Sequence, residues 1–369
     1  MSGTTKTIAI FLCLTIMPPI LMACSSLARP YLENDNRGTS TVPSTPHAVT
    51  APPTSTQTNS TQDATSSATE EGLQLTLTAS EAPGLPSGTF IVFSKTESQG
   101  ASGGISDAYY AVSAEGGLPQ PLLILPVGSS ASLSPSGKTL AHTVSRSNMG
   151  GRPELVLLDL ETGQTMEVPG TLDCGAPSWS PNGREIALAC GSGAKDIYLL
   201  TIDNFGLTQL TTWQDDYEEQ LSPAWSPDGQ WIAFLNYIGG QKRDPREGVY
   251  LIDTECLATS AACQESTLGP LDCLEWFVWS SDSKSVGCVE GSTIRFIDTS
   301  TREPSVMDFP GPIAALAWSP SGDRLAVSLL DSSGGRYIDV HMRDREEESL
   351  TRITEGQGDK FVRFWLVVP

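Results

Sequence analysis

The densest group of side chains that could bind a ligand is an acidic run near the middle of the chain. Four carboxylates fall within five positions, a tyrosine stands among them and a tryptophan precedes them: Trp213, Asp215, Asp216, Tyr217, Glu218 and Glu219. Clustered carboxylates attract a cation or a basic peptide, and aromatic side chains are enriched on protein-binding surfaces. We take this run as the candidate ligand-binding site; a solvated loop without a ligand is the alternative.

Residues suited to acid–base or covalent catalysis are scarce. The chain has three histidines, and only His142 and His341 fall in the part that we expect to fold; we expect both to be structural or exposed. The sequence has no Gly-x-Ser-x-Gly elbow, phosphate-binding loop or dinucleotide motif. We therefore predict no catalytic residue, no metal and no cofactor, and a protein that is not an enzyme.

Charge and hydropathy exclude further classes of protein. The 369 residues include 22 Lys and Arg against 43 Asp and Glu, a formal net charge of −21. Nucleic-acid binding needs clustered basic side chains, so no nucleic acid is expected as a partner. The same acidity disfavours electrostatic attachment to anionic lipid. No apolar run of membrane-spanning length follows the N-terminus, which excludes a polytopic membrane protein.

The N-terminal residues have the features of a targeting signal. Lys6 precedes an apolar stretch of 14 residues from Ile8 to Leu21, which is short for a bilayer span. The stretch ends in Leu21-Met22-Ala23-Cys24, which resembles the bacterial lipobox. The resemblance implies cleavage after residue 23, lipidation of Cys24 and an extracytoplasmic protein held to a bacterial cell membrane by its acyl chains alone, at the cell surface or in the periplasm. An ordinary secretory signal with a chance cysteine is the alternative.

A linker follows the anchor. Between residues 25 and 87, 29 of 63 residues are Ser, Thr or Pro, and Tyr31 is the only aromatic residue. Such a composition buries too little apolar surface to offset the entropy of ordering, so residues 24–87 are predicted to be a disordered tether. Its Ser and Thr residues beside Pro would suit O-glycosylation.

The rest of the chain contains a repeated sequence motif. A short motif recurs at spacings of 46, 46, 54 and 39 residues: Leu133-Ser-Pro-Ser-Gly137, Trp179-Ser-Pro-Asn-Gly183, Trp225-Ser-Pro-Asp-Gly229, Trp279-Ser-Ser-Asp-Ser283 and Trp318-Ser-Pro-Ser-Gly322. Pro, Asn or Asp and Gly are turn residues, and apolar segments flank each motif as two strands of a hairpin. A third and a weaker fourth strand follow. Four short strands in about 40–45 residues are typical of a β-propeller blade.

The two ends of the repeat region complete one blade. Residues 361–365 match a first strand, and residues 89–93, 107–112 and 120–125 match a second, third and fourth strand. We therefore predict an all-β domain over 88–369: a six-bladed β-propeller of four-stranded blades, closed by the C-terminal strand pairing with the N-terminal blade. The repeated tryptophans are expected to pack between neighbouring blades.

These motifs carry a family resemblance. The run Trp-Ser-Pro-(Asp/Asn)-Gly-x-x-Ile-Ala resembles the WD-like repeat of TolB-type propellers, which also occurs in prolyl oligopeptidases. Residues 223–229 are the best single match. The resemblance covers about 280 residues and implies the fold, while this propeller serves binding, scaffolding and, with additions, catalysis. The first unit has Leu133 in place of Trp, and the fourth departs at Ser281 and Ser283.

Six cysteines lie in the folded region. In the blade alignment Cys174 and Cys190 fall on adjacent strands of one blade, as do Cys273 and Cys288, and Cys256 and Cys263 bracket a short loop. Fifteen pairings are formally possible, and the alignment favours these three disulfides, which fit an oxidising compartment. A zinc site is the competing interpretation, although no Cys-x-x-Cys occurs.

The function that follows is binding or scaffolding. Residues 88–369 hold 19 Lys and Arg against 37 Asp and Glu, so the acidity belongs to the propeller and points to a basic partner. We expect a monomer whose partner is an envelope or extracellular protein or peptide. Two alternatives stay open: an enzyme of propeller fold that acts on extracellular glycan or peptide, and an envelope sensor or assembly factor.

Overall fold

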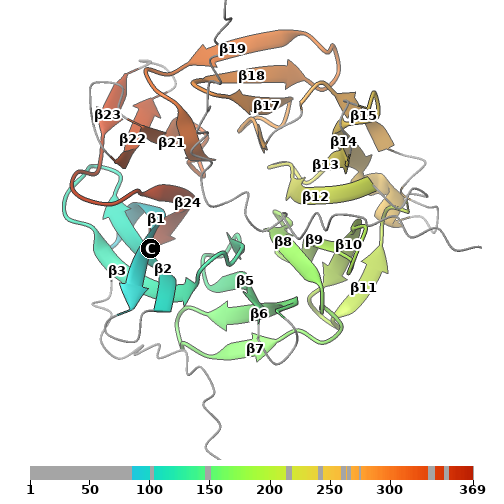
Figure 1. Cartoon of the computed structure of the whole chain (residues 1–369), viewed down its shortest axis with the longest axis horizontal. Helices are drawn as coiled ribbons and strands as arrows, with labels where there is room; N and C mark the ends of the chain where they lie inside the picture. The colour runs from blue at the N-terminus through green and yellow to red at the C-terminus, as the bar shows by residue number, and fades with distance from the viewer. Residues whose placement is uncertain are drawn as a thin grey trace, which may run out of the picture. The chain divides into compact units, whose positions relative to one another are not determined.

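A ring of six four-stranded antiparallel sheets forms the folded part of the chain in the computed structural model (Figure 1). The structure describes residues 85–99, 104–145, 151–212, 218–239, 244–258, 263, 267–273, 276–330, 337–344 and 349–368. The predicted all-β, six-bladed propeller is confirmed. Residue 24 and the other residues before 85 lie outside the described residues, so the predicted signal, anchor and tether stay predictions.

The blades follow one another along the chain. Blade 1 contains β4 (Ala131–Leu133), β5 (Thr139–Ser145), β6 (Pro153–Asp159) and β7 (Thr165–Glu167). Blade 2 contains β8 (Cys174–Trp179), β9 (Glu185–Cys190), β10 (Asp196–Thr201) and β11 (Gly206–Gln209). Blade 3 contains β12 (Glu218–Trp225), β13 (Trp231–Ile238), β14 (Gly248–Asp253) and β15 (Thr267–Leu271).

The second half repeats this order and closes the ring. Blade 4 contains β16 (Phe277–Trp279), β17 (Ser285–Glu290), β18 (Thr293–Asp298) and β19 (Pro304–Asp308). Blade 5 contains β20 (Ile313–Trp318), β21 (Arg324–Leu330), β22 (Ile338–Asp344) and β23 (Leu350–Arg352). Blade 6 joins β24 (Phe361–Val368) to β1 (Gly88–Gln99), β2 (Gly104–Ser113) and β3 (Gln120–Pro126). The predicted closure by the C-terminal strand is therefore confirmed.

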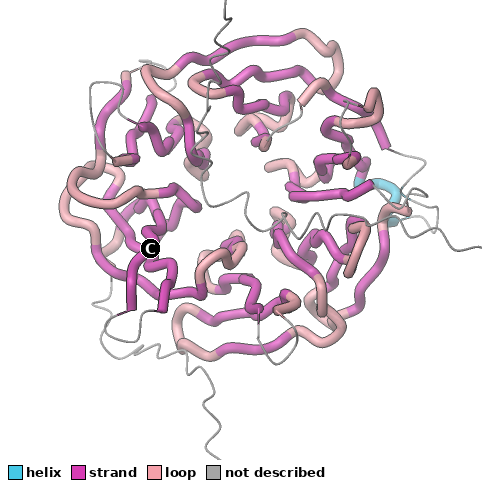
Figure 2. The backbone as a smooth tube through the Cα atoms, viewed as in Figure 1, coloured by secondary structure: helices cyan, strands magenta, loops and turns pink. Residues whose placement is uncertain are grey.

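Strands and turns account for nearly all of the described backbone (Figure 2). One short 3-10 turn, η4 (Thr254–Ala258), follows β14. Among the described residues, no helix is long and apolar enough to cross a bilayer. First strands line the centre of the ring and fourth strands lie at its outer edge (Figure 1).

The serine of each repeated motif closes the turn between the first and second strands. The hydroxyl of Ser180 accepts a hydrogen bond from the amide of Glu185 at 3.0 Å, and its carbonyl accepts one from the amide of Gly183 at 2.9 Å. Gly183 has φ 71°, a left-handed conformation that suits glycine. The same serine bond recurs in the other four motifs. The invariant Ser between Trp and Pro is therefore a structural residue.

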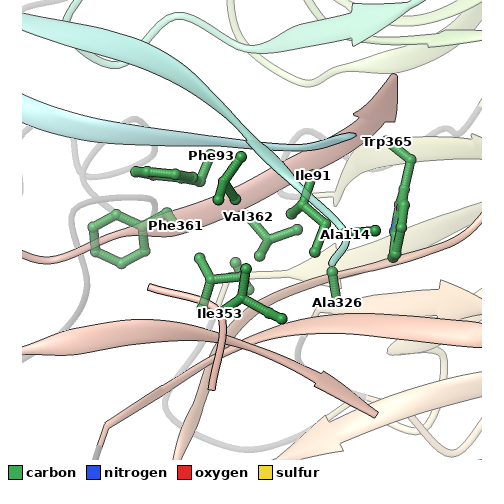
Figure 3. Packing of buried hydrophobic residues seen from close by; sticks show 11 residues of the cluster. Ile91, Phe93, Ala114, Ala326, Ile353, Phe361, Val362 and Trp365 are labelled. Carbon is green, nitrogen blue, oxygen red and sulfur yellow. The ribbon is translucent and has the colours of Figure 1, made fainter. Parts of the chain in front are cut away.

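The repeated tryptophans join neighbouring blades, as predicted. The indole nitrogens of Trp179, Trp279 and Trp365 each donate to a backbone carbonyl in the first strand of the preceding blade, at 3.2, 3.0 and 2.8 Å. Six clusters of buried apolar side chains lie between adjacent blades of the described ring. In the closing cluster, Ile91, Phe93 and Val362 of blade 6 pack against Ala326 and Ile353 of blade 5 (Figure 3). Side-chain burial between blades thus holds the ring together.

Candidate functional site

The acidic run begins outside the described residues and ends on a strand. Trp213, Asp215, Asp216 and Tyr217 lie outside the described residues, whereas the backbones of Glu218 and Glu219 are the first two positions of β12. Glu218 is in register with Ile238 and Glu219 with Tyr237, both on β13. The expected loop therefore stops at residue 217. The reason is that β13 runs on to Ile238 and offers backbone partners to residues that have low strand propensity.

Glu219 is partly neutralised by a neighbouring blade. The Nζ atom of Lys195, in the connection between β9 and β10, lies 3.7 Å from an Oε atom of Glu219. The carbonyl of Lys195 also accepts a hydrogen bond from the amide of Gln220 at 2.9 Å. A half-exposed ion pair of this length adds little stability. Its effect is to place the carboxylate of Glu219 against blade 2.

Buried amides lie directly beneath this segment. Gln220 on β12 and Asn236 on β13 are in register with each other, and both are fully buried. The Thr211 hydroxyl donates to Oε1 of Gln220, and Nδ2 of Asn236 donates to the carbonyl of Arg246 at 3.1 Å. The Tyr250 hydroxyl donates to that same carbonyl at 3.1 Å. Hydrogen-bonded polar groups in a dry site hold one geometry, so they fix the chain on both sides of the candidate site.

Exposed apolar side chains are more numerous on one face of the propeller than on the other, and they come from several blades. Strands alternate in direction, so the connections from second to third strands leave on the same face as those from one blade to the next. We call this the crossover face and define it by six apolar side chains that are 36–61% exposed: Ile105, Val127, Leu172, Tyr237, Trp276 and Leu330. The opposite face carries three among the described residues, Leu118, Leu257 and Val367. Sequence reasoning overlooked Tyr237 and Trp276, although each stands at a strand end in the repeat alignment.

The basic side chains beside this face are bound to acids. Arg152 donates through Nε to Asp173 at 2.7 Å, in addition to the Lys195–Glu219 pair. The Arg152 guanidinium beside Asp173 lowers the pKa of that carboxyl below its usual range. These two cations are therefore already paired with acids of the propeller itself.

The two histidines of the propeller lie on β5 and β22. His142, on β5, has no exposed surface, and burial lowers the pKa of its imidazole. Neither ring nitrogen of His142 has a hydrogen-bond partner among the described residues. His341 lies inside β22, which continues to Asp344. The described residues hold no cluster of His, Cys, Asp and Glu that could bind a metal ion.

The six cysteines pair as predicted. Disulfides join Cys174 to Cys190, Cys256 to Cys263 and Cys273 to Cys288, with Cα–Cα distances of 4.0, 5.1 and 5.5 Å. Cys174 and Cys190 are register partners on β8 and β9. Because all six sulfurs are used, the competing zinc site is wrong.

Comparison with known proteins identifies the type of propeller. Residues 124–244 match the family model described as the TolB beta propeller domain. A curated protein named "Protein TolB homolog", from Chlorobium chlorochromatii (strain CaD3), is 37% identical over 106 residues, 28% of this chain and 22% of its own. "Tol-Pal system protein TolB" from Desulfosudis oleivorans is 38% identical over 53 residues, 14% of this chain and 11% of its own.

A solved structure agrees in fold. The crystal structure of TolB from Acinetobacter baumannii superposes with a TM-score of 0.56 at 18% identity, over 75% of this chain and 66% of that one. The matches thus span about a fifth and a tenth of the two curated relatives and just under two thirds of the solved chain. The chain carries a TolB-like six-bladed β-propeller.

Proposed function

We propose that this protein is a cell-envelope binding module: a propeller outside the cytoplasm, anchored through lipidated Cys24, that holds a protein or peptide partner on its crossover face. The observation that carries the proposal is that exposed apolar side chains are more numerous on that face than on the opposite one. Tyr237, which is in register with Glu219 at the start of β12, and Trp276 are among them. Aromatic side chains of this kind dominate the binding energy of protein interfaces.

Charge indicates the chemistry of the partner. The 37 acidic residues of 88–369 outnumber the 19 basic ones, and Arg152 and Lys195 beside the crossover face are already paired with acids. A partner with lysines or arginines around an apolar patch would complement both the acidity of this surface and its exposed apolar side chains. Asp215 and Asp216, next to β12, would then contact its cations.

The cell envelope is supported by three independent features. Disulfides persist in oxidising compartments, and this propeller has three. Leu21-Met22-Ala23-Cys24 resembles a lipobox at the end of an apolar signal. One relative is named as a protein of the Tol-Pal system.

The catalytic alternative finds less support. It needs histidine, arginine and metal ligands at an accessible place near the axis. His142 is buried, and the described residues hold no metal-binding cluster. The proposal therefore assigns no chemical step to the crossover face.

Affinity capture from envelope extracts tests the binding role. Wild-type protein is compared with Trp276→Ser, which removes an aromatic side chain from the crossover face, and with Val306→Ser, which alters a more exposed apolar residue on the outer strand β19. We expect one protein captured by the wild type and by Val306→Ser to fall at least tenfold with Trp276→Ser. Equal capture by all three, or equal loss in both variants, would contradict the proposal.

A further inference from the structure

A second candidate site lies at the outer edge of the ring, between blades 3 and 4. A cavity of about 430 Å³ separates the end of β15 in blade 3 from β18 and β19 in blade 4. Its apolar walls are Pro270, Leu271, Ile297 and Pro304, and two arginines, Arg295 and Arg302, project at its rim. This volume suits a small ligand or a single terminal residue of a peptide.

Arg295 is held rigidly at the cavity. Its Nε and Nη2 atoms donate to Oε1 of Glu290 at 2.9 and 2.6 Å, and Nη2 donates to the carbonyl of Asp272 at 2.6 Å. These bonds use the Nε donor and both donors of Nη2. Because an arginine presents five N–H donors, the two donors of Nη1 remain for a ligand.

Arg302 occupies a backbone position that favours glycine. It has φ 66°, and the matching position in blade 1 is Gly163, with φ 71°. The two turns are equivalent bond for bond: Arg302 donates its amide to the carbonyl of Asp298 at 3.0 Å, as Gly163 does to that of Asp159 at 2.8 Å. Non-glycine residues are uncommon in this left-handed region, and strain of this kind is concentrated at functional sites.

Packing does not explain the choice of arginine. In blade 2 the left-handed position of the corresponding turn holds Phe205, which packs against the apolar cluster between blades 1 and 2. The Arg302 side chain is exposed, and it makes no hydrogen bond or ion pair to any residue that the structure describes. The guanidinium group therefore remains available to a ligand.

The turn fixes the place of Arg302. The Asp298 carboxylate accepts hydrogen bonds from the amides of Ser300 and Thr301 at 2.9 and 2.8 Å and from the Ser300 hydroxyl at 2.7 Å. These bonds lower the pKa of Asp298 to about 2, so the turn keeps its geometry at every physiological pH. The backbone position from which the Arg302 side chain starts is therefore fixed, while no described residue holds the side chain itself.

We propose that this cavity binds a carboxylate carried on a compact apolar group, as in the C-terminal residue of a peptide or an N-acylated amino acid. Arg302 and the Nη1 donors of Arg295 hold the carboxylate, because the guanidinium fork matches its two oxygens. Pro270, Ile297 and Pro304 cover the apolar group. Asp272 and Glu290 beside the arginines repel a second negative charge, which selects a monocarboxylate over a phosphate.

Calorimetric titration with defined probes tests the site on the purified protein. The probes are acetyl-Ala-Ala-Leu with a free carboxylate, the same peptide as its C-terminal amide, and N-acetyl-leucine. We expect the free acid to bind and the amide to bind at least tenfold more weakly, because charge-assisted hydrogen bonds are lost. Tighter binding of the tripeptide acid than of N-acetyl-leucine identifies a peptide C-terminus, and equal binding identifies a small acylated amino acid.

Two variants separate ligand binding from structure. Arg302→Gly removes the guanidinium and suits the left-handed backbone, so binding of the acid should fall at least tenfold while the thermal unfolding temperature does not fall. Arg184→Gln, at another exposed arginine, should bind as the wild type does. The proposal is overturned if neither acid binds at millimolar concentration, if acid and amide bind equally, or if Arg302→Gly binds normally or unfolds at a lower temperature.

Discussion

Gln220 and Asn236 face each other across β12 and β13 at the position where blade 2 has the disulfide between Cys174 and Cys190. Gln220 lies five residues before Trp225, as Cys174 lies five before Trp179. Asn236 lies five residues after the start of β13, as Cys190 does for β9. Two buried amide side chains thus occupy the register positions that carry a covalent bridge in blade 2, and Oδ1 of Asn236 has no hydrogen-bond partner among the described residues.

Gln220→Ala should lower the free energy of unfolding by about 1–3 kcal/mol, because it removes the buried amide that accepts a hydrogen bond from the Thr211 hydroxyl and opens a small cavity. Urea unfolding measures the change. Gln164→Ala, at an exposed turn residue, is the matched control and should unfold as the wild type does. An equally small effect of both variants would show that the buried amides contribute nothing.

Because His142 is buried, we expect the protein to lose stability in mild acid. Burial lowers the pKa of the folded imidazole below its value of about 6.5 in the unfolded chain. The unfolded state therefore takes up the proton first, so the stability present above about pH 6.5 is lost as the pH falls toward the folded pKa, by at most about 1.4 kcal/mol per pH unit.

Urea unfolding at pH 7.5 and at pH 5.5 measures this slope, which is the change in the free energy of unfolding with pH. The groups that face His142 are Glu154 on the same face of its own sheet and Tyr109, Asp107 and Arg363 from blade 6, so the slope is compared with and without the imidazole. His142→Leu should flatten it, whereas His341→Gln should not. An unchanged slope in His142→Leu would assign the acid sensitivity to other groups.

Lys360 is expected to stabilise the closure of the ring. Its Nζ atom lies 2.7 Å from Oδ1 of Asp339, and both side chains are almost fully buried. Lys360→Met should cost about 3 kcal/mol in urea unfolding, because it leaves the Asp339 carboxylate buried with Arg352 as its one remaining cation. Lys138→Met, which breaks an exposed ion pair with Glu161, should have no measurable effect. Equal behaviour of the two variants would contradict this role.

Much of the fold could be predicted because the local chemistry repeats. The Trp-Ser-Pro-Asn-Gly pattern specifies one turn and one inter-blade contact, and five copies of it, with one split blade, determine the ring. The same alignment paired the cysteines correctly. The position of Arg302 could not be recognised from the sequence, because its equivalence to Gly163 depends on the hydrogen bonds of the two folded turns.

The candidate site was less predictable. Acidic residues are typical of loops, and nothing local indicated that Glu218 and Glu219 would extend a strand. Their strand conformation is set by pairing with β13, whose residues lie outside the acidic run from which a loop was expected. The exposure of Tyr237 and Trp276 likewise depends on how the blades pack.

The predicted anchor has a direct test in living cells. Metabolic labelling with a fatty acid should label the wild-type protein and not Cys24→Ala, because the acyl chains need that sulfur. Cys13→Ala, which changes the other cysteine before the propeller, should remain labelled. Absence of label from the wild type would leave an ordinary secretory signal as the explanation, and label that persists in Cys24→Ala would contradict lipidation at Cys24.

The central claim, that the crossover face holds a partner protein, is tested most directly by site-specific photocrosslinking in intact cells. A photoreactive amino acid replaces Tyr237 on the crossover face or Val306 on the outer strand, two exposed positions on different surfaces. We predict a discrete adduct of one partner protein from position 237, lost when Trp276→Ser is added, and none from position 306. No adduct from position 237, or the same adduct from both positions, would contradict the account.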